Sequence, residues 1–135
     1  MKIIMLKGAS DSGKTTTLHL VYEELVNNRH AKVVEYAPLG TPAPNKPQDI
    51  ACILEYKGLK VAIYTMGDYV RGIQNAIKDC MAKSVDVLII ANSNKPQFDS
   101  LMQQPGNILI EKTKAAPALR DTDNMKYAMQ IIDAI

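Results

Sequence analysis

Lys2-Ile-Ile-Met-Leu-Lys7 runs directly into Gly8-Ala-Ser-Asp-Ser-Gly-Lys-Thr15, and this stretch decides the fold. The continuous apolar run is typical of a strand buried on both faces of a parallel sheet. From Lys14 onward the apolar residues change to helical spacing. The stretch therefore predicts a strand, a glycine loop and a helix, and the apolar face of that helix consists of Leu18, Val21, Tyr22, Leu25 and Val26.

The glycine loop fits the pattern G-x-x-x-x-G-K-[ST] without departure. Its glycines let the backbone curl round an anion, so that successive N–H groups and the positive end of the helix point inward. Lys14 would then reach the β- and γ-phosphates, the Thr15 hydroxyl would ligate Mg²⁺, and Thr16 would donate to the α-phosphate. The alternative is an ordinary glycine-rich turn, which has no need of Lys-Thr after its second glycine. The nucleotide-binding residues predicted here are Gly8, Ser10, Asp11, Ser12, Gly13, Lys14, Thr15 and Thr16.

In this loop, placed between a buried strand and an amphipathic helix, the sequence resembles the P-loop NTPase superfamily. The resemblance is firm over residues 2 to 26 and extends loosely, through the order of elements, to the whole chain. It implies Mg²⁺-nucleotide binding by Gly8 through Thr16. It also implies an acidic residue at the C-terminal end of a neighbouring strand, where such a residue holds the magnesium directly or through water.

The remaining pattern alternates strands and helices. Two β-rich runs flank Gly58 and predict an antiparallel hairpin at about residues 50–66. Four prolines between Pro38 and Pro47 forbid regular structure there. We expect a three-layer α/β P-loop fold, with helices on both sides of a mostly parallel sheet whose one antiparallel element is the hairpin. The other expected elements are strands at 32–37, 85–91 and 108–111, a helix from residue 70, and a terminal helix capped by Thr122 or Asp123.

Composition narrows the class of protein. The 135 residues, 47% of them hydrophobic, suit a single P-loop nucleotide-binding domain over residues 1–135. A formal charge of +2 gives no signal for nucleic acid or for an anionic membrane surface. Cys52 and Cys80 lie far apart within apolar runs and are interpreted as core residues. No apolar run is long enough for a signal peptide or a membrane span, so we expect a cytoplasmic protein.

The second half of the site is predicted from the strand that ends before Gly67. No acid follows this strand immediately, but Gly67 could bend the backbone and bring Asp68 toward the γ-phosphate. Asp68 is therefore the candidate for holding the metal or orienting the attacking water, and the alternative is that it only caps the next helix. Arg71 lies one turn further on and is the candidate cation near the phosphates. Lys14 is expected to be exposed at its helix start.

Two further observations bear on the nucleotide base. The small GTPases carry an aspartate where this chain has Tyr64, and Asn94-Lys-Pro-Gln97 lacks the carboxylate that accepts two hydrogen bonds from guanine. ATP is therefore favoured over GTP. Lys114, in the loop after the last strand, is a candidate for flanking the base, although a solvated basic connector is equally compatible with the pattern.

Three functions remain open on these residues. The first is an ATP hydrolase or switch, the second a kinase that passes the γ-phosphoryl group to a small acceptor, and the third a GTP-binding switch or a module that binds nucleotide without turnover. An unidentified small-molecule acceptor or protein regulator would be the partner. Because few arginines are available to clamp two anionic substrates, binding of Mg²⁺ and ATP with hydrolysis is the favoured interpretation.

Overall fold

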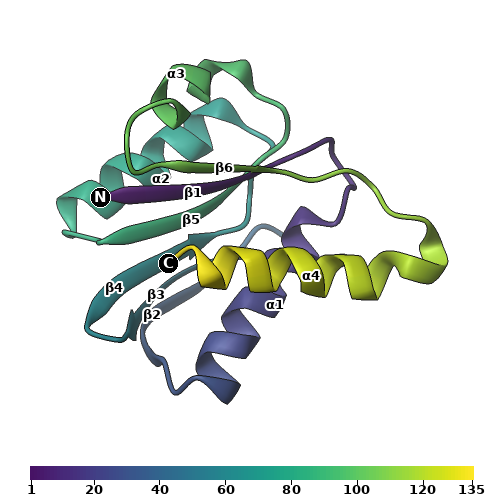
Figure 1. Ribbon diagram of the computed structural model, residues 1–135, viewed down its shortest axis with the longest axis horizontal. Helices are drawn as coiled ribbons and strands as arrows, with labels where there is room; N and C mark the ends of the chain where they lie inside the picture. Colours follow the sequence, from purple (N-terminus) through teal and green to yellow (C-terminus); the bar gives the residue numbers. More distant parts are fainter.

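Six strands form one sheet in the computed structural model, which describes all 135 residues (Figure 1). The sheet has the order β2-β3-β4-β5-β1-β6, in which β3 is antiparallel to both β2 and β4 and the other neighbouring strands are parallel. The chain is thus an α/β protein with a mostly parallel sheet. The strands are β1 (Lys2–Lys7), β2 (Lys32–Leu39), β3 (Asp49–Tyr56), β4 (Leu59–Tyr64), β5 (Val87–Asn92) and β6 (Ile108–Glu111).

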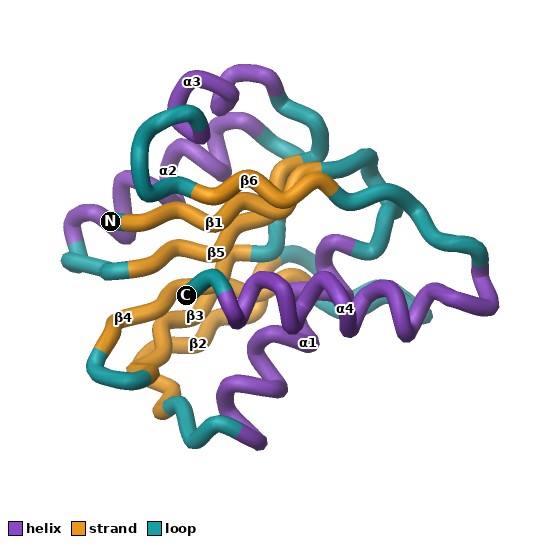
Figure 2. The backbone as a smooth tube through the Cα atoms, in the orientation of Figure 1, coloured by secondary structure: helices purple, strands orange, loops and turns teal.

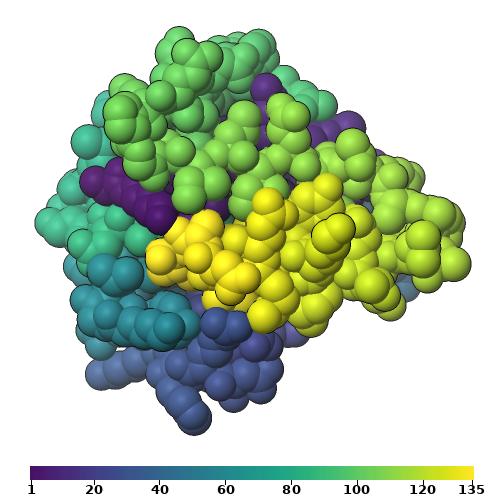
Figure 3. All heavy atoms as spheres, in the orientation of Figure 1, coloured from purple at the N-terminus to yellow at the C-terminus, as the bar shows by residue number.

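Helices cover both faces of the sheet (Figures 1 and 2). One face carries the two helices that pack against each other, α1 (Lys14–Glu23) and α4 (Arg120–Asp133), and the space-filling view shows α4 across the middle of this face (Figure 3). The other face carries α2 (Val70–Ala82) and the short α3 (Asp99–Met102). A π-helical turn, η1 (Glu24–Asn28), continues α1, and 3₁₀ turns η2 (Pro96–Phe98) and η3 (Pro117–Leu119) precede α3 and α4.

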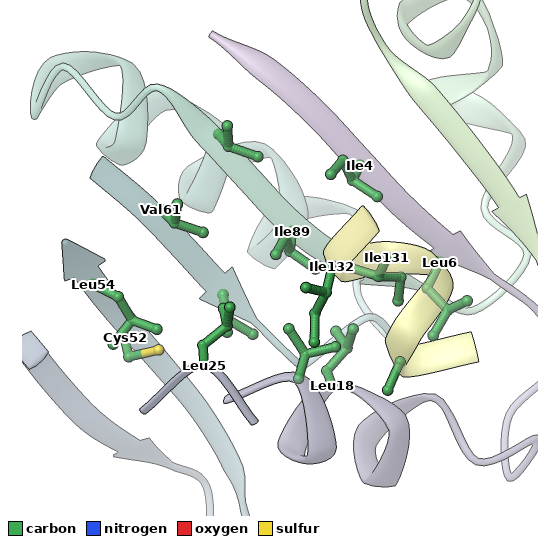
Figure 4. Packing of buried hydrophobic residues seen from close by; sticks show 14 of the residues in the cluster. Ile4, Leu6, Leu18, Leu25, Cys52, Leu54, Val61, Ile89, Ile131 and Ile132 are labelled. Atoms are coloured by element: carbon green, nitrogen blue, oxygen red, sulfur yellow. The ribbon is translucent and has the colours of Figure 1, made fainter. Parts of the chain in front are cut away.

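Two apolar cores lie on the two faces of the sheet. The larger core joins α1 and α4 to inward-facing residues of the strands, and it includes Leu18 of α1, Ile4 of β1 and Ile89 of β5, all fully buried (Figure 4). The smaller core places Ile73 and Phe98 against Met5 and Ile90. Because alternate residues of β1 face opposite cores, its continuous apolar run is buried on both faces, as the sequence predicts.

The predicted hairpin is present as β3 and β4, with Glu55 opposite Lys60 and Ala51 opposite Tyr64. The strand before it differs from the prediction, because β2 continues through Pro38 to Leu39. β2 is the edge strand of the sheet and needs a hydrogen-bonding partner on one side only. Proline is tolerated on such an edge because its missing N–H is not required by the ladder.

The order of the strands differs from the expectation that the acidic residue follows a strand next to β1. The strand that precedes Asp68, β4, is not a neighbour of β1, because β5 lies between them. The start of α4 differs too: the helix begins at Arg120, its N-cap residue Leu119 makes no side-chain cap, and neither Thr122 nor Asp123 caps it. Asp123 instead accepts a hydrogen bond from Lys112 Nζ at 2.9 Å. No helix combines the length and apolar character that a membrane crossing needs.

Candidate nucleotide-binding site

A polar pocket of about 540 Å³ opens at the carboxyl edge of the parallel strands. None of its lining residues is hydrophobic. Because β3 runs antiparallel, its first residue lies at this same edge, beside the last residues of the other strands. The lining consists of Ser10, Asp11, Gly13, Lys14, Thr15, Thr16, Asn45, Lys46, Pro47, Asp49, Thr65, Gly67, Asp68, Ser93, Lys114, Arg120 and Asn124.

The glycine loop between β1 and α1 forms the floor of this pocket. Asp11 and Gly13 have positive φ, 64° and 92°, so the backbone curls between strand and helix. A side chain at Gly13 would bring its Cβ to 2.7 Å from Asn124 Oδ1, which explains the second glycine. Gly8 and Ser12 are buried beneath the floor and do not line the pocket. Gly8 lies against the carbonyl oxygen of Lys112.

The first turn of α1 presents unpartnered backbone donors to the pocket. Gly13 makes no side-chain cap, and the N–H groups of residues 13 to 16 donate to no acceptor within the protein. Thr15 and Thr16 both line the pocket, whereas Thr17 turns its hydroxyl back to the Gly13 carbonyl at 2.8 Å. An uncapped helix start of this kind favours a bound anion through its N–H groups and its partial positive charge.

Two buried polar atoms beside this helix start also lack partners. Ser12 Oγ and Asn124 Oδ1 make no hydrogen bond, although their residues are 4% and 2% exposed. A buried polar group without a partner costs free energy, so its presence needs an explanation. Asn124 lines the pocket and lies at Gly13, where a ligand bound at the helix start would meet it.

Lys14 is buried rather than exposed, contrary to expectation, with 6% of its surface accessible. Its Nζ donates to the carbonyl oxygen of Ala9 at 2.6 Å, so the ammonium group lies across the glycine loop. Burial lowers the pKa of Lys14 below its ordinary value, while the negative charges of Asp68 and Asp11 act in the opposite direction. Lys14 is buried because the glycine loop wraps round its side chain and screens it from water.

Asp49, at the start of β3, is the main residue that the sequence reasoning missed. Its Oδ1 accepts hydrogen bonds from Thr65 Oγ1 at 2.7 Å and from Thr15 Oγ1 at 3.3 Å. A usable signal was present, because Asp49 directly precedes the apolar run of an expected hairpin strand. In an antiparallel strand that position falls at the same edge as the glycine loop.

Asp68 also lines the pocket, although the strand that precedes it, β4, is not adjacent to β1. The backbone at Gly67 passes directly over the end of β5, where an added Cβ would lie 2.6 Å from the carbonyl carbon and oxygen of Ala91. Asp68 does not cap α2, whose N-cap residue is Tyr69. Its Oδ1 instead accepts a hydrogen bond from Ser93 Oγ, on the loop after β5, at 2.5 Å.

Four cationic side chains line the pocket together with three carboxylates, those of Asp11, Asp49 and Asp68. The cations are Lys14, Lys46, Lys114 and Arg120. Lys46 also pairs with Asp11 at 3.4 Å, which ties the loop before β3 to the glycine loop. Arg71 is exposed on α2 and does not line the pocket, so Arg120, which the sequence reasoning did not select, is the arginine that the structure brings there.

The segment tested for guanine recognition, residues 94–97, does not line the pocket. Comparison with protein-family models, with curated proteins and with solved structures finds no match to this chain. The chemistry of the site therefore rests on its own residues. They combine an uncapped helix start, a buried lysine, hydroxyl groups and carboxylates around one strongly polar pocket.

Proposed function

We propose that this chain binds a Mg²⁺-nucleoside triphosphate, with ATP favoured over GTP, and hydrolyses it. The observation that carries the proposal is the uncapped start of α1, where four successive N–H groups and Lys14 face a pocket without any hydrophobic lining. Such a pocket suits a polyanion, because most of its lining side chains are polar or charged and would be costly to bury against an apolar ligand. It also suits the phosphates rather than the base.

Each residue of the floor has a role that follows from its chemistry. The N–H groups at residues 13 to 16 would donate to phosphate oxygens, and Lys14 would exchange its bond to the Ala9 carbonyl for a charge-assisted bond to phosphate. Thr16 would contact the phosphate nearest the nucleoside. Lys114 and Arg120 lie on the α4 side of the pocket and would neutralise further negative charge.

Magnesium fits the donors that are present. Thr15 offers a hydroxyl oxygen, and carboxylates of the same pocket offer further oxygens, which are the ligands that Mg²⁺ prefers. When bound, the ion would neutralise phosphate charge during hydrolysis. Asp68, which reaches the pocket over β5, has a free carboxylate oxygen with which to orient water.

Calorimetric titration with Mg·ATP and Mg·GTP tests nucleotide binding. We expect wild-type protein to bind Mg·ATP more tightly than Mg·GTP, and Lys14→Ala to lose binding while remaining folded by circular dichroism. Lys126→Ala is the matched control, since Lys126 is exposed on α4 and does not line the pocket. Unchanged affinity in a folded Lys14→Ala protein would contradict the assignment of the phosphate site.

A kinase is the second candidate. The observation in its favour is that Lys46 and Arg120 line the pocket besides Lys14, so the pocket holds more cations than one triphosphate loop supplies. Extra positive charge is what a second anionic substrate requires. Release of phosphate and of ADP from Mg·ATP, measured with and without a panel of nucleoside, nucleotide and sugar acceptors, separates the candidates. ADP formation that depends on an acceptor would favour the kinase.

A further inference from the structure

We propose that the two pocket carboxylates divide the chemistry of the site, with Asp49 serving the metal ion and Asp68 serving the attacking water. This inference rests on the proposed function, and it assigns to Asp49 the metal role that the sequence suggested for Asp68. The two side chains differ in their hydrogen bonds.

Asp49 is held rigidly by the hairpin. Thr65 is fully buried, and its hydroxyl oxygen accepts the backbone N–H of Ile50 at 2.9 Å. The single hydroxyl proton of Thr65 is therefore left for Asp49, 2.7 Å away. The backbone N–H of Thr65 also bonds to the Ile50 carbonyl at 3.1 Å, so Thr65, the residue after β4, is tied to β3 directly beside Asp49. A site residue fixed by strands is positioned more precisely than one on a free loop.

The Asp49 carboxylate also accepts a hydrogen bond from the Thr15 hydroxyl. Thr15 Oγ1 lies 3.3 Å from Asp49 Oδ1. A threonine hydroxyl that ligates a cation through its lone pair must direct its proton elsewhere, and Asp49 is the acceptor present. Asp49 thereby aims the lone pair of Thr15 into the pocket and adds a negative charge beside the cation. It acts as a positioning residue for the metal ligand and as part of the electrostatic site for the ion.

Asp68 has different partners. It bonds to the Ser93 hydroxyl and to neither threonine. Its negative charge counteracts the lowering of the Lys14 pKa that burial causes. Asp68 and Lys14 line the same pocket, where Lys14 would meet the terminal phosphates. A carboxylate there, held by one hydroxyl, is placed to accept a hydrogen bond from the attacking water.

Nucleotide affinity measured by calorimetry with Mg²⁺ and with EDTA tests this division. For Asp49→Asn we expect the gain in ATP affinity caused by Mg²⁺ to fall at least about tenfold, because the negative charge behind the metal ligand is lost and changes to such supporting groups usually cost that much. Affinity in EDTA should stay the same or rise, because a negative charge near the phosphates is lost. For Asp68→Asn we expect the wild-type response to Mg²⁺ and a fall in phosphate release of at least about tenfold.

Two further sets of variants separate the role of Asp49 from general effects on folding or charge. Thr65→Val removes the hydroxyl that holds Asp49 and should weaken the response to Mg²⁺, whereas Thr65→Ser should retain it. Asp133→Asn, on the exposed end of α4, is the control for loss of one carboxylate, and thermal melts verify that each variant is folded. Wild-type protein that binds ATP under neither condition would overturn the proposed function and this inference together. An unchanged Mg²⁺ response in folded Asp49→Asn, or its loss in Asp68→Asn, would overturn this inference alone.

Discussion

Replacing Gly67 by alanine probes the point at which the fold delivers Asp68 to the pocket. Gly67 crosses the end of β5, and its backbone carbonyl accepts the N–H of Ser93 at 2.9 Å. An alanine Cβ would lie 2.6 Å from the carbonyl carbon and oxygen of Ala91 and 2.8 Å from the Asn92 nitrogen. All three atoms are backbone atoms of a central strand, so no flexible side chain can move aside.

The cost follows from this geometry. Real Cβ atoms essentially never come closer than 3.0 Å to such atoms, so the crossing must shift by about 0.4 Å or more. Overpacking of this kind costs about 1–3 kcal/mol. With an unfolding entropy of about 2.1 cal/mol/K per residue over 135 residues, the melting temperature should fall by about 4–11 °C. The shift also moves Asp68 away from Ser93, so phosphate release should fall.

Differential scanning calorimetry and a phosphate-release assay measure the two effects. Gly58→Ala is the control, because Gly58 has φ of 77° and nothing within 4 Å of an added Cβ. That variant should lose about 1 kcal/mol from backbone strain alone and keep wild-type turnover. If Gly67→Ala melts within 1 °C of wild type and turns over nucleotide normally, Gly67 does not pass this close to β5.

Three other perturbations have definite expected outcomes. Leu18→Ala, at a fully buried site between α1 and the sheet, should lower the free energy of unfolding by about 2–5 kcal/mol in urea denaturation. Because burial lowers the pKa of Lys14, the folded state favours the neutral amine. The nucleotide-free protein should therefore gain stability as pH rises through that lowered pKa toward 10.5, and Lys14→Met should lack this gain in thermal melts across that range. Burial raises the pKa of Cys52 to about 12 and of Cys80 to about 11, so both thiols should resist iodoacetamide at pH 8 until urea unfolds the protein; rapid labelling of the native state would contradict their burial.

Elements with a local signal follow from the sequence. The run Lys2–Lys7, the glycine loop and the helix that follows are each specified by residues a few positions apart, and the structure has them as β1, the pocket floor and α1. The β3–β4 hairpin was equally predictable, because Gly58 separates two β-rich runs. The burial of Lys14 does not follow from the sequence, because a helix start is usually exposed and only the wrapping of the loop buries this one.

The tertiary structure alone decided which side chains share the pocket. An apolar pattern shows that a strand is buried but not which strand it pairs with, so the place of β5 between β4 and β1 has no local signal. That order forces the crossing at Gly67, and the antiparallel direction of β3 brings Asp49 to Thr15. Arg120 and Asn124 reach the same pocket because α4 packs on α1. The sequence by itself determined a strand, a glycine loop and a helix, because local backbone preference and periodicity act over a few residues. The carboxylates, the arginine and the asparagine around that loop were decided by pairing between distant segments, which only the folded sheet reveals.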